Sequence, residues 1–456
     1  MTVFSLPIIR QGKFSLLNSV ETVKMAHAFF SGKEFISMYK QKYPGKKIVS
    51  VTLPFSEIIV AMDAIPLNLI RNEEYTYKET HILMHRITEI TKIFGWGAID
   101  NLLKLAYFTR AGADVVDILC ENMIGALNER YGQLPKYAEE HGFPVDSCFG
   151  SRMLYATNLR QGKVADASFD VPYRCPFFAK YYDSLTPFMK NNYLLDVPVT
   201  TGEAAESFLL ADLKEFIAML ERLTGNAFSE VRLAEAIGAT NEIKAIYKEI
   251  LYGICKGDML PYNPLTFSEV QALMMYGLID FNSNLKAFRS NFKRLFSEMN
   301  GKISRGEGFD AARCPKILYV PMFTGFEQEN IKAISRLGGR VILADWEIFG
   351  LLEPISTSSD VLRNFALHML RMNQFLGFNN DTFANTMVRV AKDIGVDGVL
   401  FQSTFGCKNL GPVLKIFKEK ARQNGIPVVE TSFNNVGENL EQNKTRIEAF
   451  MEMIRA

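Results

Sequence analysis

The six cysteines are the side chains of this 456-residue chain with the clearest capacity for chemistry, because a thiolate is both a nucleophile and a metal ligand. Cys175 and Cys407 each follow a short apolar run and precede a helical run, and Cys148 lies beside a turn. Open α/β sheets bind ligands at the carboxyl ends of their strands, and a helix N-terminus favours an anion or a thiolate. These three cysteines are therefore candidate ligands or nucleophiles. Their wide separation forms no local metal-binding signature, so spacing alone also allows ordinary buried thiols.

The other three cysteines have positions that are typical of packing residues. Cys120 and Cys255 fall within helical periods, and Cys314 precedes a strand at its amino edge. A free cysteine commonly behaves as a small buried hydrophobe, so we expect these three to belong to the core. His81 and His85 are four residues apart and could share a metal ion, but without a patterned third ligand an ordinary surface or interface pair is the better interpretation.

The elements that must position these thiols are short apolar strands that alternate with helical periods. Seven such runs are predicted as strands: Lys47–Leu53, Phe169–Val171, Tyr193–Val197, Lys316–Val320, Arg340–Ala344, Asp397–Gln402 and Pro427–Glu430. This alternation is typical of βα units and of parallel sheets that are buried on both faces. We therefore predict an α/β protein with two Rossmann-like parallel-sheet domains.

A different pattern lies between the two sets of strands, from Thr201 to about Asp310. Apolar residues recur there at helical spacing, first up to Gly225, which is predicted to cap a helix C-terminus, and then beyond it. We predict a helical domain inserted between the two α/β domains. The predicted division is an N-terminal helical extension at 1–45, a first α/β domain at 46–200, the helical domain at 201–312 and a second α/β domain at 313–456.

The overall composition excludes several classes of function. The 51 Lys+Arg and 50 Asp+Glu leave a net charge of +1, and 48% of the residues are apolar. A nucleic-acid binder usually carries a basic surplus, so we expect neither nucleic acid nor a membrane as a partner. No apolar stretch reaches the ~18–20 residues that span a bilayer, and the few cysteines indicate reduced thiols in the cytoplasm. The sequence also lacks a GxxxxGK(S/T) phosphate loop, a GxSxG elbow, an HExxH motif and a CxxC pair. The absence of these motifs excludes most nucleotide hydrolases, most other hydrolases and zinc proteases as candidate functions.

Several segments, taken in order, resemble the 2-hydroxyacyl-CoA dehydratase and benzoyl-CoA reductase family. They are Pro54–Pro66, Asp146–Cys148 with Arg152, Cys175 before an aromatic helix, Leu195–Pro198, Leu220–Ile237, Pro315–Pro321, Asp397–Val399, Cys407, Gly425–Pro427 and Lys444–Phe450. The order and spacing of these segments together are fairly specific. The resemblance covers essentially everything after the predicted N-terminal extension, and the chain looks most like a 2-hydroxyglutaryl-CoA dehydratase D-component subunit.

The resemblance implies that Cys148, Cys175 and Cys407 hold a [4Fe-4S] cluster in the interdomain cleft, with one iron open to water or substrate. It implies an oxygen-sensitive lyase subunit that removes water from an (R)-2-hydroxyacyl-CoA to give a 2-enoyl-CoA. In the implied mechanism a separate ATP-dependent activator injects an electron, a ketyl radical expels hydroxide, and the electron returns at the end of the turnover. The implied partners are the acyl-CoA substrate, this activator, and either a related second subunit or a second copy of the chain.

Departures from the family pattern keep alternatives open. Gly150 stands where an aromatic residue often follows the first cysteine, and the early Pro-x-Glu is stretched to Pro54–Glu57. The alternatives are a benzoyl-CoA-reductase-type subunit, which reduces an aromatic acyl-CoA, and a non-catalytic or double-cubane electron-transfer relative.

The substrate-binding residues are less well defined than the cysteines. Substrate-contacting positions of the family fall near Thr52 and Glu73, where the alignment is too loose to assign roles. By position alone, Arg71, Arg152 and Lys408 are candidates for contacts with the CoA phosphates, although a solvated surface cation is the better interpretation of each.

Overall fold

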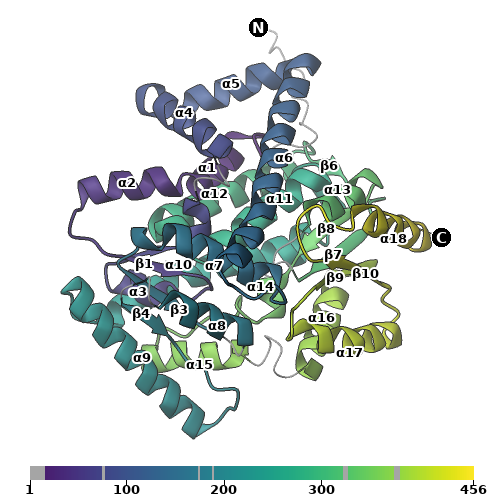
Figure 1. Cartoon of the computed structure of the whole chain (residues 1–456). Coiled ribbons are helices and arrows are strands. Elements are labelled where there is room, and N and C mark those ends of the chain that lie inside the picture. The colour runs from purple at the N-terminus through teal and green to yellow at the C-terminus, as the bar shows by residue number, and fades with distance from the viewer. Residues whose placement is uncertain are drawn as a thin grey trace.

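The structure is a computed structural model that describes residues 16–73, 78–172, 175–186, 189, 191–321, 327–373 and 380–455. Its framework consists of two four-stranded sheets, and the strands within each sheet are all parallel. Figure 1 shows the first sheet towards the lower left of the view and the second towards the right. The predicted pair of parallel α/β sheets is confirmed.

The first sheet has the strand order β2-β1-β3-β4. Its strands are β1 (Ile48–Val51), β2 (Ile65–Leu67), β3 (Ala167–Asp170) and β4 (Asn192–Leu194). β1, β3 and β4 overlap predicted strands. The predictions omit β2, because a three-residue strand that contains a proline carries little signal; Pro66 is tolerated there since β2 is an edge strand.

The second sheet has the order β10-β9-β7-β8. Its strands are β7 (Lys316–Val320), β8 (Arg340–Leu343), β9 (Gly398–Thr404) and β10 (Val428–Phe433). Each overlaps a predicted strand, and the observed and predicted ends differ by at most three residues. Because the strands are parallel, their carboxyl ends lie at one edge of the sheet. A short antiparallel pair, β5 (Met259–Leu260) with β6 (Phe309–Asp310), lies outside both sheets.

The N-terminal half contains eight described helices. They are α1 (Val20–Phe30), α2 (Gly32–Lys42), α3 (Glu57–Ala61), α4 (Lys78–Phe94), α5 (Trp96–Phe108), α6 (Arg110–Glu140), α7 (Phe149–Gln161) and α8 (Pro176–Leu185), with 3-10 turns at Leu69–Asn72 and Gly162–Val164. α1 and α2 correspond to the predicted N-terminal helices, whose first fifteen residues lie outside the described part. α4, α5 and the first part of α6 extend away from the first sheet, which the alternating strand pattern does not predict (Figure 1).

The segment between the two sheets is helical, as predicted. It comprises α9 (Glu203–Thr224), α10 (Glu230–Glu249), a π-helical turn (Ile250–Ile254), α11 (Pro264–Gly277), a 3-10 turn (Phe281–Ser283) and α12 (Leu285–Ser304). Gly225 ends α9 in the left-handed conformation, with φ of 74°, which confirms its predicted role as a cap.

This helical segment also covers an edge of the second sheet. An uncovered edge strand such as β8 would present unpaired backbone groups. Gln271 of α11 accepts a hydrogen bond from the Leu343 N–H (3.2 Å) and donates one to the Val341 carbonyl (3.4 Å). Tyr247 of α10 donates to the Leu343 carbonyl (3.0 Å). The helices are therefore fixed to the sheet by hydrogen bonds as well as by apolar contact.

The C-terminal half is a doubly wound unit. Its helices are α13 (Gln328–Arg336), α14 (Asp345–Ile348), α15 (Val361–Asn373), α16 (Asn380–Ile394), α17 (Leu410–Gln423) and α18 (Leu440–Met453). α16 packs with α17 and α13 packs with α18, and Figure 1 shows the first pair below the second sheet and the second pair above it.

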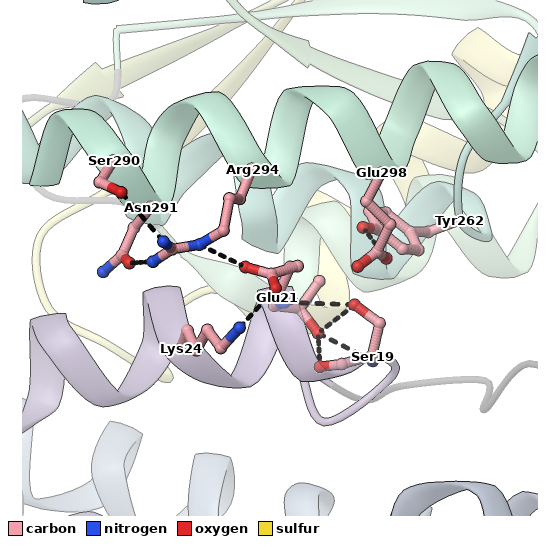
Figure 2. A network of polar contacts seen from close by, with 9 residues as sticks. Ser19, Glu21, Lys24, Tyr262, Ser290, Asn291, Arg294 and Glu298 are labelled. Carbon is pink, nitrogen blue, oxygen red and sulfur yellow. Dashed lines mark hydrogen bonds and ion pairs between the residues drawn. The ribbon is translucent and has the colours of Figure 1, made fainter. Parts of the chain in front are cut away.

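The N-terminal helix α1 lies against α12 through a polar network (Figure 2). Arg294 of α12 donates to Glu21 of α1 (3.3 Å), which also accepts from Lys24 (2.5 Å). Such partly exposed ion pairs contribute only ~0–1 kcal/mol each. Met25 and Phe29 of α1 are buried in the main apolar core, so apolar packing supplies most of the attachment.

That main core is continuous from α1 to α18 and includes side chains from both sheets. A buried ion pair crosses it: Arg71 donates to Asp280, both are at most 1% exposed, and Asp280 also accepts from the Asn68 N–H (2.8 Å). Among the described helices, none combines the length and apolar character needed to cross a membrane.

Candidate functional site

Cys148 is the N-terminal cap residue of α7 and is 6% exposed. Its Sγ lies 3.3 Å from the Ser151 hydroxyl in the first turn of the same helix. The next residue, Phe149, is fully buried, and its ring meets Phe433 at the carboxyl end of β10 edge-to-face, with centroids 4.9 Å apart. The start of α7 from the first half of the chain is therefore attached to the carboxyl edge of the second sheet.

Cys175 is the N-terminal cap residue of α8, a short loop beyond the carboxyl end of β3. Its N–H donates to the Pro172 carbonyl (2.9 Å). The partly buried side chain packs against the apolar cluster that contains Phe149 and Phe433. Cys175 therefore packs against the cluster that contains Phe149, the residue that follows Cys148.

Cys407 follows the carboxyl end of β9 and precedes α17. Its N–H donates to the Thr404 carbonyl (3.1 Å). Burial raises the pKa of the Cys407 thiol to about 12, and the nearby Cys148 and Cys175 add to this rise, while hydrogen bonds from the Leu410 and Asn409 N–H groups oppose it.

Gly406 explains how the loops come so close. Its φ is +75°, and a Cβ at this position would lie 2.4 Å from the Asp146 carbonyl oxygen and 2.9 Å from the Cys148 nitrogen. The loop after β9 therefore rests directly on the backbone that precedes α7. Only glycine permits both this conformation and this approach.

The three thiols share one electrostatic setting, the N-terminus of a helix. Cys148 and Cys175 cap α7 and α8, and Cys407 lies three residues before the start of α17. Helix N-termini carry a partial positive charge and unpaired N–H groups, which favour a thiolate, but at Cys407 burial outweighs this effect and the pKa of the thiol is raised. The donors are chemically suited to an iron–sulfur cluster, which is held by cysteine thiolates.

Within the described residues, no group of three or more Cys, His, Asp or Glu side chains is arranged to hold a single metal ion. Each thiolate of an iron–sulfur cluster bonds a different iron, so the ligands of a cluster lie farther apart than the ligands of one ion. The assignment of Cys148, Cys175 and Cys407 as cluster ligands therefore stays a prediction.

The remaining cysteines have other surroundings. Cys120 is buried on α6 and Cys255 is buried beside Gln271, with Sγ 3.7 Å from the amide oxygen. Cys314 lies just before β7, and like Cys255 it interacts with Arg340, at the amino end of β8. Cys314 and Cys255 are therefore at the opposite edge of the second sheet from Cys407.

The candidate cations for the CoA phosphates require correction. Arg71 is 1% exposed and pairs with Asp280, and Arg152 is 4% exposed and bonds Glu139 (2.5 Å) and the Asn434 carbonyl (2.9 Å). Both arginines hold the structure together and neither is a surface cation. Of the three candidates only Lys408 is exposed, as an anion-binding lysine would have to be.

Glu73 is also part of the structural framework. It is 0% exposed and accepts two hydrogen bonds from Arg160, at 3.0 and 3.1 Å. This bidentate pair occupies both carboxylate oxygens. Glu73 therefore links α7 to the segment after β2, and neither of its carboxylate oxygens is left for a substrate.

A second polar group lies beside the carboxyl end of β1. Thr240 donates to Glu57 Oε1 (2.9 Å) at the start of α3. Glu57 Oε2, Lys244 Nζ and His368 Nε2 are all buried, and none has a hydrogen-bond partner within the described residues. Burial and the Lys244 ammonium lower the pKa of His368 well below its usual value, so its imidazole is neutral. His368 lies on α15, in the second half of the chain, so no local sequence pattern places it beside Glu57 and Lys244.

Sequence reasoning missed Asp170, the last residue of β3. It is 4% exposed and accepts a hydrogen bond from Thr52, which follows β1. Burial raises the pKa of the Asp170 carboxyl to about 7, against the effect of the Thr52 bond, and Tyr181 and Tyr182 of α8 are its other titratable neighbours. A polar residue at the end of an apolar strand is the signal that would have found it.

The raised pKa of Asp170 predicts a pH-dependent effect on stability. Between about pH 4 and pH 7 the unfolded chain ionises this carboxyl while the folded chain keeps it protonated, so its contribution is full below about pH 4 and is lost as the pH rises through 7. Between pH 5 and pH 8, Asp170→Asn should therefore gain about 3 kcal/mol of stability relative to the wild type. Urea unfolding at both pH values checks this, and an unchanged difference between variant and wild type would contradict it.

The two parallel sheets make the chain an α/β protein. Cys175 follows the carboxyl end of a strand in the first sheet, and Cys407 follows one in the second sheet, so the predicted thiol site lies between the two halves of the chain. The chain belongs to the 2-hydroxyglutaryl-CoA dehydratase D-component family, whose model matches residues 54–454. A search among curated proteins finds no match. Membership in this family makes the chain a subunit of a dehydratase-type enzyme and agrees with the resemblance recognised in the sequence.

Proposed function

We propose that this chain is the [4Fe-4S] subunit of an ATP-activated 2-hydroxyacyl-CoA dehydratase, which converts an (R)-2-hydroxyacyl-CoA into a 2-enoyl-CoA. The observation that carries the proposal is the contact of the Gly406 loop with the backbone of Asp146 and Cys148. This contact holds the loop that precedes Cys407 against the backbone of Cys148, which supports a site that the two residues share. The family match over residues 54–454 supports the substrate class.

The residues of the chain have defined tasks in this proposal. Cys148, Cys175 and Cys407 would hold three irons, and the helix N-termini behind them would offset the negative charge of their thiolates. When bound, a [4Fe-4S] cluster with an open iron supplies low-potential electron transfer and a position for substrate. The Ser151 hydroxyl, 3.3 Å from Cys148 Sγ, is placed to hydrogen-bond that sulfur.

The proposal divides the reaction between proteins. The proton to be lost lies β to the thioester and is scarcely acidic. Addition of one electron would turn the acyl group into a ketyl radical, and this radical would expel hydroxide. The β-proton would then be acidic enough for a modest base. The absence of a GxxxxGK(S/T) loop from the sequence agrees with a separate ATP-hydrolysing activator. We also propose a related second subunit or a second copy as a partner, and a cytoplasmic location.

Anaerobic turnover tests the proposal. The purified chain, its activator and any second subunit are incubated with a panel of (R)-2-hydroxyacyl-CoA esters, and 2-enoyl-CoA is measured together with ATP consumed. Dehydration predicts product in large excess over ATP, because the electron is recycled. Reduction of benzoyl-CoA with ATP consumed at every turnover would instead identify a reductase. No turnover of either substrate class by a chain that contains the cluster would indicate an electron-transfer subunit.

A further inference from the structure

The polar group of Glu57, Lys244 and His368 lies where three parts of the chain meet. Glu57 begins α3, which follows the first strand of the first sheet. Lys244 lies on α10 of the helical segment, and His368 lies on α15 of the second half. Helix α10 packs against both α3 and α15. The three side chains therefore come from helices that are neighbours in space and distant in the sequence.

Two direct contacts hold these helices together beside the polar group. Thr240 of α10 donates to Glu57 Oε1 (2.9 Å), and Lys244 follows Thr240 by four residues, on the same face of the helix. The ring of His368 meets the ring of Phe55 edge-to-face, with centroids 6.0 Å apart. Because Phe55 precedes Glu57 by two residues, this contact places α15 against the start of α3.

The polar atoms of this group are buried without partners. Glu57 and Lys244 are 3% exposed and His368 is 1% exposed. Glu57 Oε2, Lys244 Nζ and His368 Nε2 form no hydrogen bond with any described residue. Within the part of the chain that the structure describes, Lys244 is the one lysine whose ammonium is enclosed in this way. Leaving such groups unpaired is costly, and most of all for charged ones.

The opposite charges of Glu57 and Lys244 do not remove this cost by direct contact. Burial lowers the pKa of the Lys244 ammonium, and the charges of Glu57 and Glu353 oppose the effect. Glu57 Oε2 and Lys244 Nζ nevertheless share no hydrogen bond, since each of them lacks a partner. The two charged groups therefore act on each other across a short gap in the core.

One water molecule matches the hydrogen-bonding capacity of the three atoms. The Lys244 ammonium only donates, the Glu57 carboxylate oxygen only accepts, and a neutral imidazole nitrogen does one or the other. Water donates two hydrogen bonds and accepts two, and a buried water typically makes about three with groups that are otherwise unpaired. A metal cation would be repelled by the ammonium and an anion by the carboxylate, so the group favours a neutral occupant.

We propose that Glu57 Oε2, Lys244 Nζ and His368 Nε2 form a buried binding site for a water molecule that joins α3, α10 and α15. The site also helps to fix the segment between β1 and α3. Phe55 in this segment has a φ of 98°, which a non-glycine residue keeps only where its surroundings hold it. Ser56 donates to the Ile279 carbonyl (2.6 Å), and the water fixes the next residue, Glu57. This inference is independent of the cluster and of the proposed reaction.

A high-resolution crystal structure of the full chain tests the site directly. We expect one water peak at about 2.5–3.2 Å from each of Glu57 Oε2, Lys244 Nζ and His368 Nε2. A direct hydrogen bond between Lys244 and Glu57 with no water beside it would overturn the proposal. So would a peak with anomalous scattering, which would identify a bound ion.

A pair of variants of equal length tests the site in solution. Glutamine and methionine are both unbranched and both lose the ring contact with Phe55, but only glutamine keeps a polar group for the water. We expect the urea midpoint of His368→Gln to lie between those of the wild type and His368→Met. If His368 Nε2 instead faces a dry core, the midpoint of His368→Met will equal or exceed that of His368→Gln, and the site is excluded.

The next residue on α15 provides the control for this comparison. Met369 is 0% exposed and lies in the main apolar core. Met369→Gln should lower the urea midpoint relative to the wild type, because it places an amide in the core without a partner. A preference for glutamine over methionine at residue 368, with the reverse preference at residue 369, is the result that the water site predicts.

Discussion

Gly406→Ala is expected to reduce the iron content of the anaerobically purified protein several-fold. The added Cβ would lie 2.4 Å from the Asp146 carbonyl oxygen and 2.9 Å from the Cys148 nitrogen, where backbone cannot yield as a flexible side chain would. Alanine at a φ of +75° adds ~1–2 kcal/mol of conformational strain. The loop must therefore move away from α7, and Cys407 must move with it. Iron and sulfide analysis measures the loss.

Gly411→Ala is the matched control. This glycine lies in the first turn of α17, five residues further on, and a Cβ there would meet no atom within 4 Å. Alanine in a helix is ~0.5–1 kcal/mol more favourable than glycine, so the control should keep its iron and be slightly more stable. Full iron content in a folded Gly406→Ala protein would contradict the proposed role of the loop contact.

Cys148→Ser, Cys175→Ser and Cys407→Ser are each expected to abolish or nearly abolish cluster binding and turnover. Serine keeps the size and the hydrogen bonding of cysteine but replaces the thiolate, which is the ligand that iron–sulfur clusters use. The loss should appear in the iron content and in the electron paramagnetic resonance signal of the reduced protein. Far-ultraviolet circular dichroism should remain that of the wild type, because serine differs from cysteine only at the sulfur atom, although Cys407 packs against the main core and Cys148 is buried.

The other cysteines provide the internal controls for these variants. Cys120→Ala, Cys255→Ala and Cys314→Ala should retain the cluster, since Cys255 and Cys314 interact with Arg340 at the amino end of the second sheet. Cys255→Ala also loses a buried side chain and should be modestly less stable. Loss of iron in these variants would instead point to a double-cubane relative, which uses additional cysteines.

Strand positions were the part of the fold that could be predicted from the sequence. The core strands β7 and β9 are runs of apolar residues buried on both faces, and this signal is local. Strand β2 is three residues long and contains Pro66, so it carried no such signal. Helices α4 to α6 could not be foreseen either, because they interrupt a βα alternation that otherwise holds.

The position of a site residue could be predicted only where the strands and helices around it are also its neighbours in the sequence. Cys407 sits between a strand and a helix that are both visible in the sequence, so its place at a carboxyl edge could be inferred. Arg71 is buried because it meets Asp280, 209 residues away, and no local pattern reveals such a pair. The same holds for Glu57, Lys244 and His368, which three distant helices bring together.

Mössbauer spectroscopy of the reconstituted wild-type protein, with iron and sulfide analysis of the same sample, tests the central claim most directly. Three thiolates from one chain predict about four iron and about four sulfide per chain, with one iron distinct from the other three. The spectrum of that iron should change when an (R)-2-hydroxyacyl-CoA is added. Absence of a cluster, or four equivalent irons that do not respond to substrate, would contradict the assignment of Cys148, Cys175 and Cys407.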